Sequence, residues 1–397
     1  MFAADQVVSS VSNFMVVFLV ARADTRAAFG AFSVSYGIVI FTLGLRSSVV
    51  GDLVLVERRS GARPESPGAG VSLYLGLVGA AAAISAGVAL GLPRAELIAF
   101  ALTPAILVED AIRTAAFAAR RPGSALVVDS LWLLVQIALT FVLGPSRGSS
   151  IVFSWVVGAI VACAWGWRLA APALSPMLCV RWLRERRHLA GPYALQYGCT
   201  TGVTQMLGLF VATVGRVRDA GALRGGQTLL GPYNICLSAS RLDLLTRLRH
   251  DESVASMRRA YRRSVLLLTA VAACIATVAL ALPTSIGVHI LGPTWPFAAH
   301  VTPFIVCEMW LVGLAQPAQV RLTAGLQSRA SLRAKAFAGA TAILVLTVLG
   351  LLGVSALRCA IAALNASAFV NLIATSLASR RLTPVSGLPH ELAGVTP

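Results

Sequence analysis

The most constraining feature of this sequence is a series of apolar segments, each close to 20 residues long, with most of the charged residues between them. An α-helix of about 20 apolar residues spans the hydrocarbon core of a bilayer. Twelve segments meet this requirement, near residues 3–21, 30–50, 71–92, 96–117, 124–144, 150–170, 191–213, 224–245, 261–282, 297–318, 334–354 and 357–378. The sequence therefore predicts an all-α polytopic membrane protein with about twelve transmembrane helices.

The composition agrees with this class. Hydrophobic residues make up 57% of the 397 residues and charged residues only 12%, whereas about a quarter of the residues of a soluble domain are charged. A surface so poor in charge favours lipid over water as its surroundings. We expect a multi-pass protein of the bacterial cytoplasmic (inner) membrane, without room for a sizeable soluble domain.

The positive charge is distributed unevenly between alternate loops. A formal net charge of +17 would suggest a nucleic-acid partner in a soluble protein. Here 23 of the Lys and Arg residues fall in one set of alternate loops and near their span ends, and only eight fall in the other. Cytoplasmic loops carry the excess of positive residues. We therefore place the first set and both termini in the cytoplasm, and we expect no nucleic-acid partner.

A basic, proline-containing stretch divides the chain into halves of six predicted spans each. We assign residues 1–170 to an N-terminal six-helix lobe, 171–190 to a basic cytoplasmic linker, 191–380 to a C-terminal six-helix lobe and 381–397 to a cytoplasmic tail. A half with an even number of spans returns to its starting side. A duplicated half would therefore repeat in parallel, about an axis along the membrane normal.

A local match supports this duplication. The segment 102–109 (LTPAILVE) resembles 301–308 (VTPFIVCE), and both segments fall on the fourth predicted span of their half. The identical pairs share one offset and are Thr103/Thr302, Pro104/Pro303, Ile106/Ile305 and Glu109/Glu308.

A second, weaker match lies on the first span of each half. It aligns Ser9, Ser12, Asn13 and Phe18 with Thr201, Thr204, Gln205 and Phe210. Such a polar stripe would suit the wall of a polar cavity, and Asn13 and Gln205 are its candidate cargo-binding residues. Small polar residues also mediate ordinary packing between membrane helices, and this alternative stays open.

Glu308 is the strongest single candidate for function. It lies near the middle of a predicted span, where an ionised side chain is costly. Pro303, about one turn before it, removes a backbone hydrogen bond and allows the helix to bend or hinge. A central carboxylate beside a hinge could take up a proton while a transporter changes shape. The alternative is a protonated Glu that bonds to a neighbouring helix.

A group of charges lies on the fourth and fifth spans. Glu109, Asp110 and Arg113 fall within one helical turn, so Arg113 can pair with both carboxylates, and Asp129 enters on the next span at a similar depth. One interpretation is a charge-neutral brace between the two spans. The other is an ion or head-group site at the inner mouth of a transporter, with these residues in coupling or gating.

Two arginines occupy equivalent places in the two halves. Arg46 on the second span and Arg241 on the eighth both lie near the cytoplasmic ends. A guanidinium can bind phosphate through two hydrogen bonds, so the pair could hold a pyrophosphate that enters from the inner leaflet. Alternatively, both could reach lipid phosphates or pair with Asp52 and Asp243.

Enzyme signatures are missing. The sequence has no Walker A, HExxH or GxSxG motif, and its seven cysteines form no CxxC pair. We therefore expect neither catalysis nor a cofactor, and no metal site.

Three stretches of the chain resemble the polysaccharide-exporter branch of the multidrug/oligosaccharidyl-lipid/polysaccharide (MOP) flippase superfamily. They are residues 5–36, with Asp5-Gln6, Ser9-Ser10, Asn13, Ala21-Arg22 and Phe29-Gly30; residues 109–132, with Glu109-Asp110, Arg113, Arg121-Pro122, Asp129 and Trp132; and residues 291–295, Leu-Gly-Pro-Thr-Trp. This resemblance implies two six-helix lobes around a central cavity that opens alternately to either side. It also implies a lipid-linked sugar or polysaccharide precursor as cargo.

We therefore expect a flippase that moves a lipid-linked saccharide across the cytoplasmic membrane by alternating access. Its partners would be membrane lipids and glycosyltransferases or a polymerase of the same pathway. Arg46 and Arg241 would meet the anionic head group, and Glu308 with Glu109 would sense protons or cations. Two alternatives remain, a cation-coupled drug or metabolite exporter of the same fold and a transport-inactive scaffold of a glycan-assembly complex.

Overall fold

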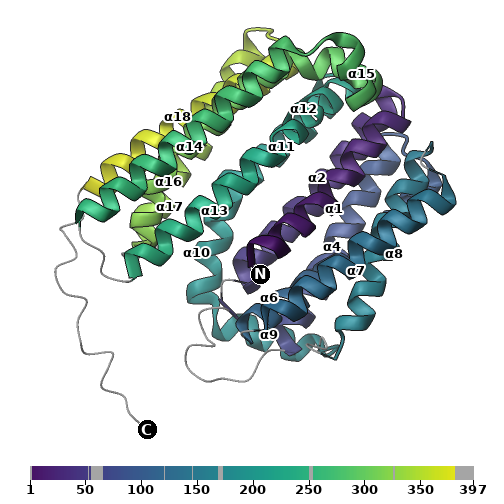
Figure 1. Cartoon of the computed structure of the whole chain (residues 1–397), viewed down its shortest axis with the longest axis horizontal. Helices are drawn as coiled ribbons and strands as arrows, with labels where there is room; N and C mark the ends of the chain where they lie inside the picture. The colour runs from purple at the N-terminus through teal and green to yellow at the C-terminus, as the bar shows by residue number, and fades with distance from the viewer. Residues whose placement is uncertain are drawn as a thin grey trace.

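The chain forms a bundle of long helices in two groups (Figure 1). The computed structural model describes residues 2–51, 53–54, 66–119, 121–144, 146–168, 173–249, 254–324 and 327–380. Within these ranges the chain is almost entirely helical and contains no β-strand. The predicted tail, 381–397, lies outside the described residues.

The N-terminal lobe follows the first six predicted spans closely. It consists of α1 (Phe2–Ala23), α2 (Arg26–Arg46) with its π-helical continuation η1 (Ser47–Gly51), α4 (Ser66–Ala89), α5 (Arg94–Ala101), α6 (Pro104–Ala118), α7 (Pro122–Leu143) and α8 (Gly148–Gly166). The fourth predicted span is divided into α5 and α6. The helix restarts at Pro104, which has no backbone donor and is therefore favoured at the first position of a helix.

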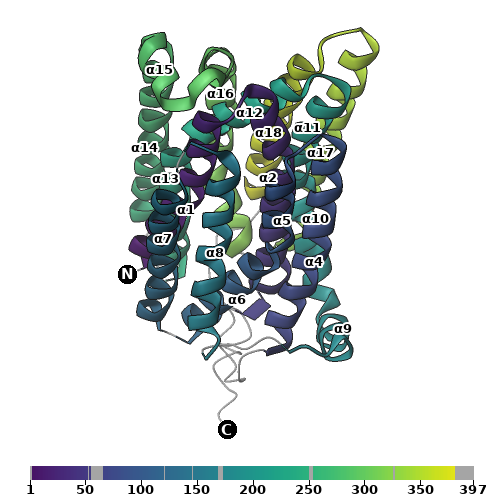
Figure 2. The ribbon, with the colours of Figure 1, turned by 90° about the vertical axis from the view of Figure 1, so that its right-hand side faces the viewer.

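The C-terminal lobe begins after a short helix in the linker. That helix is α9 (Pro176–Glu185), which lies across one end of the bundle in Figure 2. The lobe then contains α10 (Arg187–Tyr197), η3 (Gly198–Gly202), α11 (Val203–Val214), α12 (Val217–Leu229), α13 (Gly231–Arg249), α14 (Val254–Ala281), α15 (Thr284–Leu291), η4 (Gly292–Thr294), α16 (Trp295–Ala324), α17 (Ser328–Leu351) and α18 (Ala356–Arg380).

The predicted fold class is confirmed. Nine helical stretches among the described residues are long and apolar enough to cross a membrane. The other three predicted spans correspond to pairs of shorter helices, namely α5 with α6, α10 with α11, and α12 with α13. All twelve predicted segments thus coincide with helices, in an arrangement consistent with two lobes of six.

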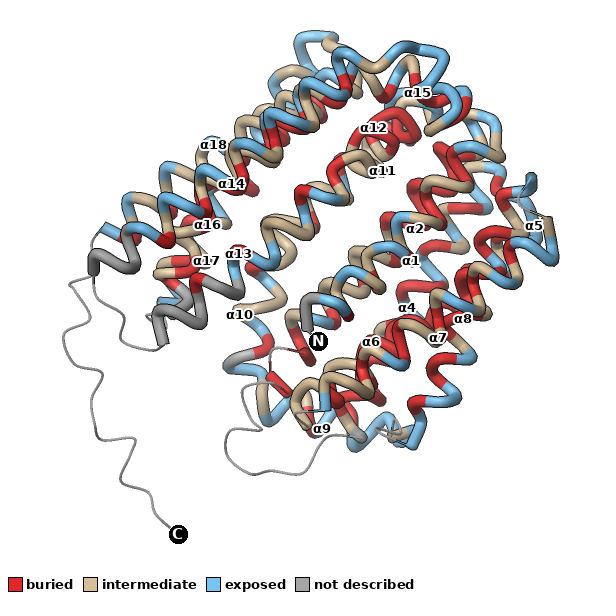
Figure 3. The backbone as a smooth tube through the Cα atoms, in the orientation of Figure 1, coloured by how far each residue is buried: buried red, intermediate tan, exposed pale blue. Residues whose placement is uncertain are grey.

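The outer faces of the bundle are apolar. Large exposed side chains such as Phe141 (76% exposed), Leu280 (72%) and Leu351 (84%) point away from the protein interior, and Figure 3 shows exposed positions along the outward sides of the long helices. Apolar surface on this scale is unfavourable in water and favourable against acyl chains. The interior contains two main apolar cores, one that includes Trp155 and lies largely in the N-terminal lobe and one that includes Tyr233 and lies largely in the other.

The lobes touch at the end of the bundle that carries α15, which we call the closed end. There α2 and α12 approach so tightly that a side chain at Gly30 would clash with the Val217 backbone. Arg26 Nε donates to the Pro293 carbonyl oxygen at 2.6 Å, and its guanidinium lies 4.3 Å from the centre of the Phe297 ring. In Figure 1 the two groups of helices diverge toward the opposite end, which carries the N-terminus and which we call the open end, although α10 still packs against η1 there.

The contact at Gly30 yields a prediction about the closed end. Gly30→Ala should force α2 away from α12, because the added methyl has no space. We expect Val34, which is 4% exposed and packs against the other lobe, to become several-fold more reactive. The measurement is thiol labelling of Val34→Cys in a cysteine-free protein in nanodiscs. Gly350→Ala is the control, since nothing lies within 4 Å of that position. Equal labelling in both variants would contradict this tight contact between α2 and α12, which we call the seam.

Candidate functional site

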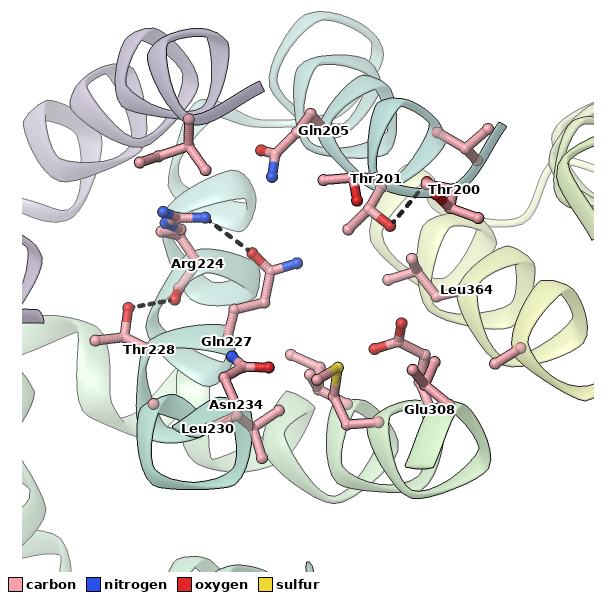
Figure 4. Close-up of a pocket in the computed structure, with 18 of the residues that line it drawn as sticks. Thr200, Thr201, Gln205, Arg224, Gln227, Thr228, Leu230, Asn234, Glu308 and Leu364 are labelled. Atoms are coloured by element: carbon pink, nitrogen blue, oxygen red, sulfur yellow. Dashed lines mark hydrogen bonds between the residues drawn. The ribbon is translucent and has the colours of Figure 1, made fainter. Parts of the chain in front are cut away.

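A cavity of about 600 Å³ lies between the lobes. Helices of both lobes line it, chiefly α1, α2, α11, α12, α16, α17 and α18. It extends from Tyr36 and Arg224, near the closed end, to Gln6, Gln319 and Lys335 toward the open end. Figure 4 shows the part between α11, α12, α16 and α18, where side chains from all four helices converge.

Uncharged polar side chains make up almost half of the residues that line the cavity. Amide and hydroxyl groups come from every side, and they belong to Gln6, Ser9, Ser10, Asn13, Thr200, Thr201, Thr204, Gln205, Gln227, Thr228, Asn234, Ser367, Gln319 and Asn371. Aromatic rings contribute only Phe14 and Tyr36 among the lining residues described. Such side chains can donate and accept many hydrogen bonds, while few of the lining residues are aromatic.

The polar stripe predicted on the first span of each lobe faces this cavity in large part. Asn13 and Gln205 both line it, as do Ser9 and Thr201. Asn13 Nδ2 donates to the Ser9 carbonyl oxygen at 3.0 Å, and no donor from the described residues reaches Asn13 Oδ1.

Ser12 is the exception in the stripe. Its hydroxyl donates to Gln136 Oε1 at 2.5 Å, and Gln136 Nε2 donates back to the Ser12 carbonyl oxygen at 3.2 Å. Ser12 therefore joins α1 to α7 inside the N-terminal lobe. The role of Asn13 and Gln205 in cargo binding stays a prediction.

Glu308 points into the cavity from α16, across from Arg224 (Figure 4). Glu308 is 9% exposed. The helix that carries it runs without interruption for 30 residues through both Pro303 and Pro317. The equivalent proline of the other lobe, Pro104, instead begins a new helix. A hinge at Pro303 therefore stays a prediction.

Two cationic side chains, Arg224 and Lys335, line the cavity. Both fall at the beginning of predicted spans, 224–245 and 334–354, and were counted there with the charges of the adjoining loops. The Arg224 guanidinium lies 4.7 Å from the centre of the Tyr36 ring and donates to Gln227 Oε1 at 3.4 Å. Lys335, toward the open end, donates to Gln196 Oε1 at 3.4 Å. Their signal in the sequence is weak, because a charge within the first or last turns of a span looks the same as a loop charge.

Arg46 and Arg241, the cationic pair expected from sequence, do not line the cavity in this structure. Arg46 is 1% exposed and faces the interior of the N-terminal lobe. It donates to Ser72 Oγ and Thr114 Oγ1, each at 3.0 Å, and pairs with Asp110. Arg241 lies exposed on α13, outside the set of lining residues. Of the alternative partners, Asp52 and the Asp243 side chain lie outside what the structure describes.

The charges of the fourth and fifth spans form a brace, as one interpretation predicted, and it reaches further than expected. Arg113 Nη2 lies 2.8 Å from Asp110 Oδ1, and Arg113 Nη1 lies 3.2 Å from Asp129 Oδ2 on α7. The same Nη1 is 3.7 Å from Asp5 Oδ2 on α1. With Arg46, the brace thus joins α1, α2, α6 and α7.

A comparison of the sequence with protein-family models and with curated proteins finds no match. The fold, by contrast, is similar to solved transporters. An inward-facing multidrug resistance MATE family transporter of the MOP superfamily superposes with a TM-score of 0.67, at 13% identity and with 94% of each chain covered. An outward-facing MATE family transporter of the same superfamily gives 0.59, at 13% identity, over 96% of this chain and 93% of the other.

Two further structures give the same result. A MOP superfamily transporter from Pyrococcus furiosus superposes with a TM-score of 0.59 at 13% identity, over 96% of this chain and 93% of that one. A Vibrio cholerae MATE transporter gives 0.58 at 14% identity, over 96% and 94%. The chain therefore has the fold of MOP superfamily transporters, with its polar cavity between the two lobes.

Proposed function

We propose that this protein is a membrane transporter that carries a lipid-linked saccharide between leaflets by alternating access. The observation that carries this proposal is the cavity wall, in which amides and hydroxyls outnumber aromatic rings and charges. Sugars present many hydroxyl groups, each of which must keep hydrogen-bond partners when it leaves water. The lining described here supplies such partners from both lobes.

We assign the open end to the cytoplasm. The linker helix α9, which contains Arg181 and Arg184, lies at that end (Figure 2), and positive residues mark the cytoplasmic side. The higher TM-score against the inward-facing transporter, 0.67 compared with 0.59 for the outward-facing one, supports the same orientation. Cargo would then load from the inner leaflet, and the seam at Gly30 would have to open for release on the other side.

The two cavity cations suit an anionic linkage in the cargo. Arg224 lies near the closed end and Lys335 toward the open end, so a phosphate or pyrophosphate could meet a cation at either depth. Hydrogen bonds to charged groups contribute about 1.5–3 kcal/mol. The acyl part of the cargo would stay in lipid while its sugar head enters the cavity.

A second candidate function rests on Glu308. A carboxylate that faces the cavity could pair with a cationic drug or metabolite, and the superposed structures include multidrug resistance transporters. Such an exporter would transport cations and would not recognise saccharides. The two functions therefore predict opposite effects for variants of Glu308 and of the polar wall.

The polar wall is tested with Gln205→Leu. Loss of an amide that bonds to the cargo should cost about 0.5–1.5 kcal/mol, or about two- to tenfold in translocation efficiency. The measurement is transfer of a lipid-linked oligosaccharide between leaflets of proteoliposomes. Thr213→Val on the same helix is the control, because Thr213 is exposed and lies outside the cavity lining. Equal effects of the two variants would count against sugar recognition by this wall.

The cavity cation is tested with Arg224→Gln. If Arg224 binds the phosphate, the affinity for an isoprenoid pyrophosphate should fall about tenfold or more, since 1.4 kcal/mol corresponds to tenfold. Arg224→Lys should restore part of it. Arg218→Gln on the same helix is the matched control, because that side chain is 45% exposed and lies outside the cavity lining. Binding measured by fluorescence or calorimetry that is unchanged in Arg224→Gln would contradict the assignment.

Glu308→Gln separates coupling from cargo charge. The amide keeps hydrogen bonds but cannot change its charge, so we expect saccharide translocation to lose part of its dependence on pH. In a cationic-drug exporter the same variant should instead abolish drug binding. Asp219→Asn, on α12 and outside the lining, is the control. An unchanged rate and pH profile would remove Glu308 from the coupling mechanism.

A further inference from the structure

The linker helix α9 runs across the open end of the bundle, whereas the long helices run along it (Figure 2). Contacts with α4 fix its depth. The Tyr74 hydroxyl donates to the Leu174 carbonyl oxygen at 2.6 Å, and a side chain at Gly70 would clash with the Ala173 carbonyl oxygen. Gly70 and Tyr74 lie at the first residues of the predicted span 71–92. The start of α9 is therefore at the depth where a span enters the membrane, the interface between lipid and water.

One side of α9 is anchored to the N-terminal lobe. Cys179 is 3% exposed and Trp182 is 7% exposed, and both pack in a small apolar core with Val71 of α4. The Arg186 guanidinium lies 4.7 Å from the centre of the Trp182 ring, and Arg186 Nη1 donates to the Trp182 carbonyl oxygen at 3.3 Å. The orientation of the helix about its own axis is thus fixed, and its other side faces away from the lobe.

Apolar side chains cover much of that other side. Met177 is 80% exposed, Val180 60% and Leu178 50%, and Leu174, just before the helix, is 67% exposed. Met177 and Val180 are three residues apart, so they lie on the same face of the helix. Apolar side chains gathered in this way are unfavourable in water. At the depth of the interface they can insert between acyl chains.

Arginines share this outward side. Arg181 and Arg184 follow Met177 by four and seven residues, which places them on its face of the helix. Both are exposed, and the Arg181 side chain is 77% exposed. Arg181 Nε lies 3.0 Å from Glu185 Oε1, but an ion pair between exposed groups contributes little. The outward side of α9 is therefore apolar and basic at the same time.

This combination matches one kind of partner better than others. An anionic phospholipid offers acyl chains to Met177 and Val180 and a phosphate to the arginines, whose guanidinium groups suit phosphate geometry. An acidic protein in the cytosol would satisfy the arginines only. It would also have to reach the depth that Tyr74 sets, where lipid is already present.

We propose that α9 docks on the inner leaflet by binding anionic phospholipids, with Met177 and Val180 among the acyl chains and Arg181 and Arg184 on the phosphates. The helix belongs to the linker between the lobes, and α10 begins directly after it. Bound lipid thus anchors the linker to the membrane surface. The choice of leaflet rests on the orientation assigned with the proposed function, whereas the lipid contact does not depend on any cargo.

The occupant of this face is identified by photocrosslinking. A benzophenone amino acid replaces Met177 in the full chain, which is placed in nanodiscs of phosphatidylcholine with phosphatidylglycerol as the minor component. Mass spectrometry of the irradiated protein identifies the adducts. We expect lipid adducts, with a share of phosphatidylglycerol several-fold above its share in the bilayer, since each basic residue near an anionic surface contributes about fivefold to binding.

The arginines are tested in the same assay with the double variant Arg181→Gln/Arg184→Gln. The share of phosphatidylglycerol among the adducts should fall toward its share in the bilayer, while lipid adducts remain because the apolar residues are unchanged. Arg147→Gln/Arg358→Gln is the matched control, since it removes two exposed arginines near the closed end, and it should leave the adducts as they are. In the protein with both arginines, high salt should lower the phosphatidylglycerol share without any substitution.

Three results would overturn the proposal. If Met177 yields no lipid adduct, or crosslinks to a second copy of the chain, α9 faces water or protein. If phosphatidylglycerol is not enriched and salt has no effect, the lipid contact is apolar only. If the double variant keeps the full enrichment, Arg181 and Arg184 do not bind the phosphates. None of these measurements uses a saccharide, so a failure of the proposed cargo leaves them unaffected.

Discussion

Charge that is buried in a lipid-embedded bundle needs a partner, and this constraint governs the structure. The long helices present apolar side chains on their outer faces, while most of the buried charged groups that the structure describes lie in two places, with Glu96 on α5 apart from both. One is the cavity between the lobes, with Arg224, Lys335 and Glu308 on a polar wall. The other is the brace inside the N-terminal lobe, where Arg46 and Arg113 join α1, α2, α6 and α7. Under the proposed function, the ionisable groups that line the cavity can contact cargo, and those of the brace cannot.

The seam at the closed end is formed more by close approach of the two helix backbones than by contacts between side chains. Gly30 and Gly221 allow α2 and α12 to touch, and Arg26 spans from α2 to Pro293 and Phe297. Small residues at helix contacts give close packing in membranes, where the hydrophobic effect contributes little between helices. A seam of this kind has few bonds to break, which suits an interface that must open and close in a transporter.

The sequence predicted where the helices lie along the chain better than it predicted which side of each helix faces the cavity. Apolar length placed all twelve segments, because the thickness of the bilayer fixes the length of a span. The internal match between the first spans also predicted the polar residues of the wall, since Ser9, Asn13, Thr201 and Gln205 all line the cavity. For Arg46 the sequence indicated the depth in the membrane. It did not indicate which helices the side chain would face, and it therefore did not predict the pair with Asp110.

Packing between distant segments explains the remaining differences. Asp5 joins Arg113 across more than one hundred residues of sequence, and no spacing rule along a helix indicates such a contact. Arg224 is the first residue of a predicted span and was counted with the charges of the preceding loop, yet α12 places its guanidinium against the Tyr36 ring inside the bundle. Glu109 and Glu308 occupy matching positions of the predicted repeat but lie in different surroundings, since Glu109 is buried within the N-terminal lobe and Glu308 faces the cavity. A sequence match of this kind therefore does not predict the surroundings of a charged group.

The central claim is that the cavity between the lobes receives the saccharide head of a lipid-linked cargo. Photocrosslinking with a lipid-linked oligosaccharide that carries the reactive group on its sugar tests this most directly, with modified peptides identified by mass spectrometry. The account predicts crosslinks to the cavity faces of α1, α11 and α12, reduced by unlabelled saccharide cargo and not by a cationic drug. Crosslinks confined to the lipid-facing surfaces of α7 and α14, or competition by the drug alone, would contradict it.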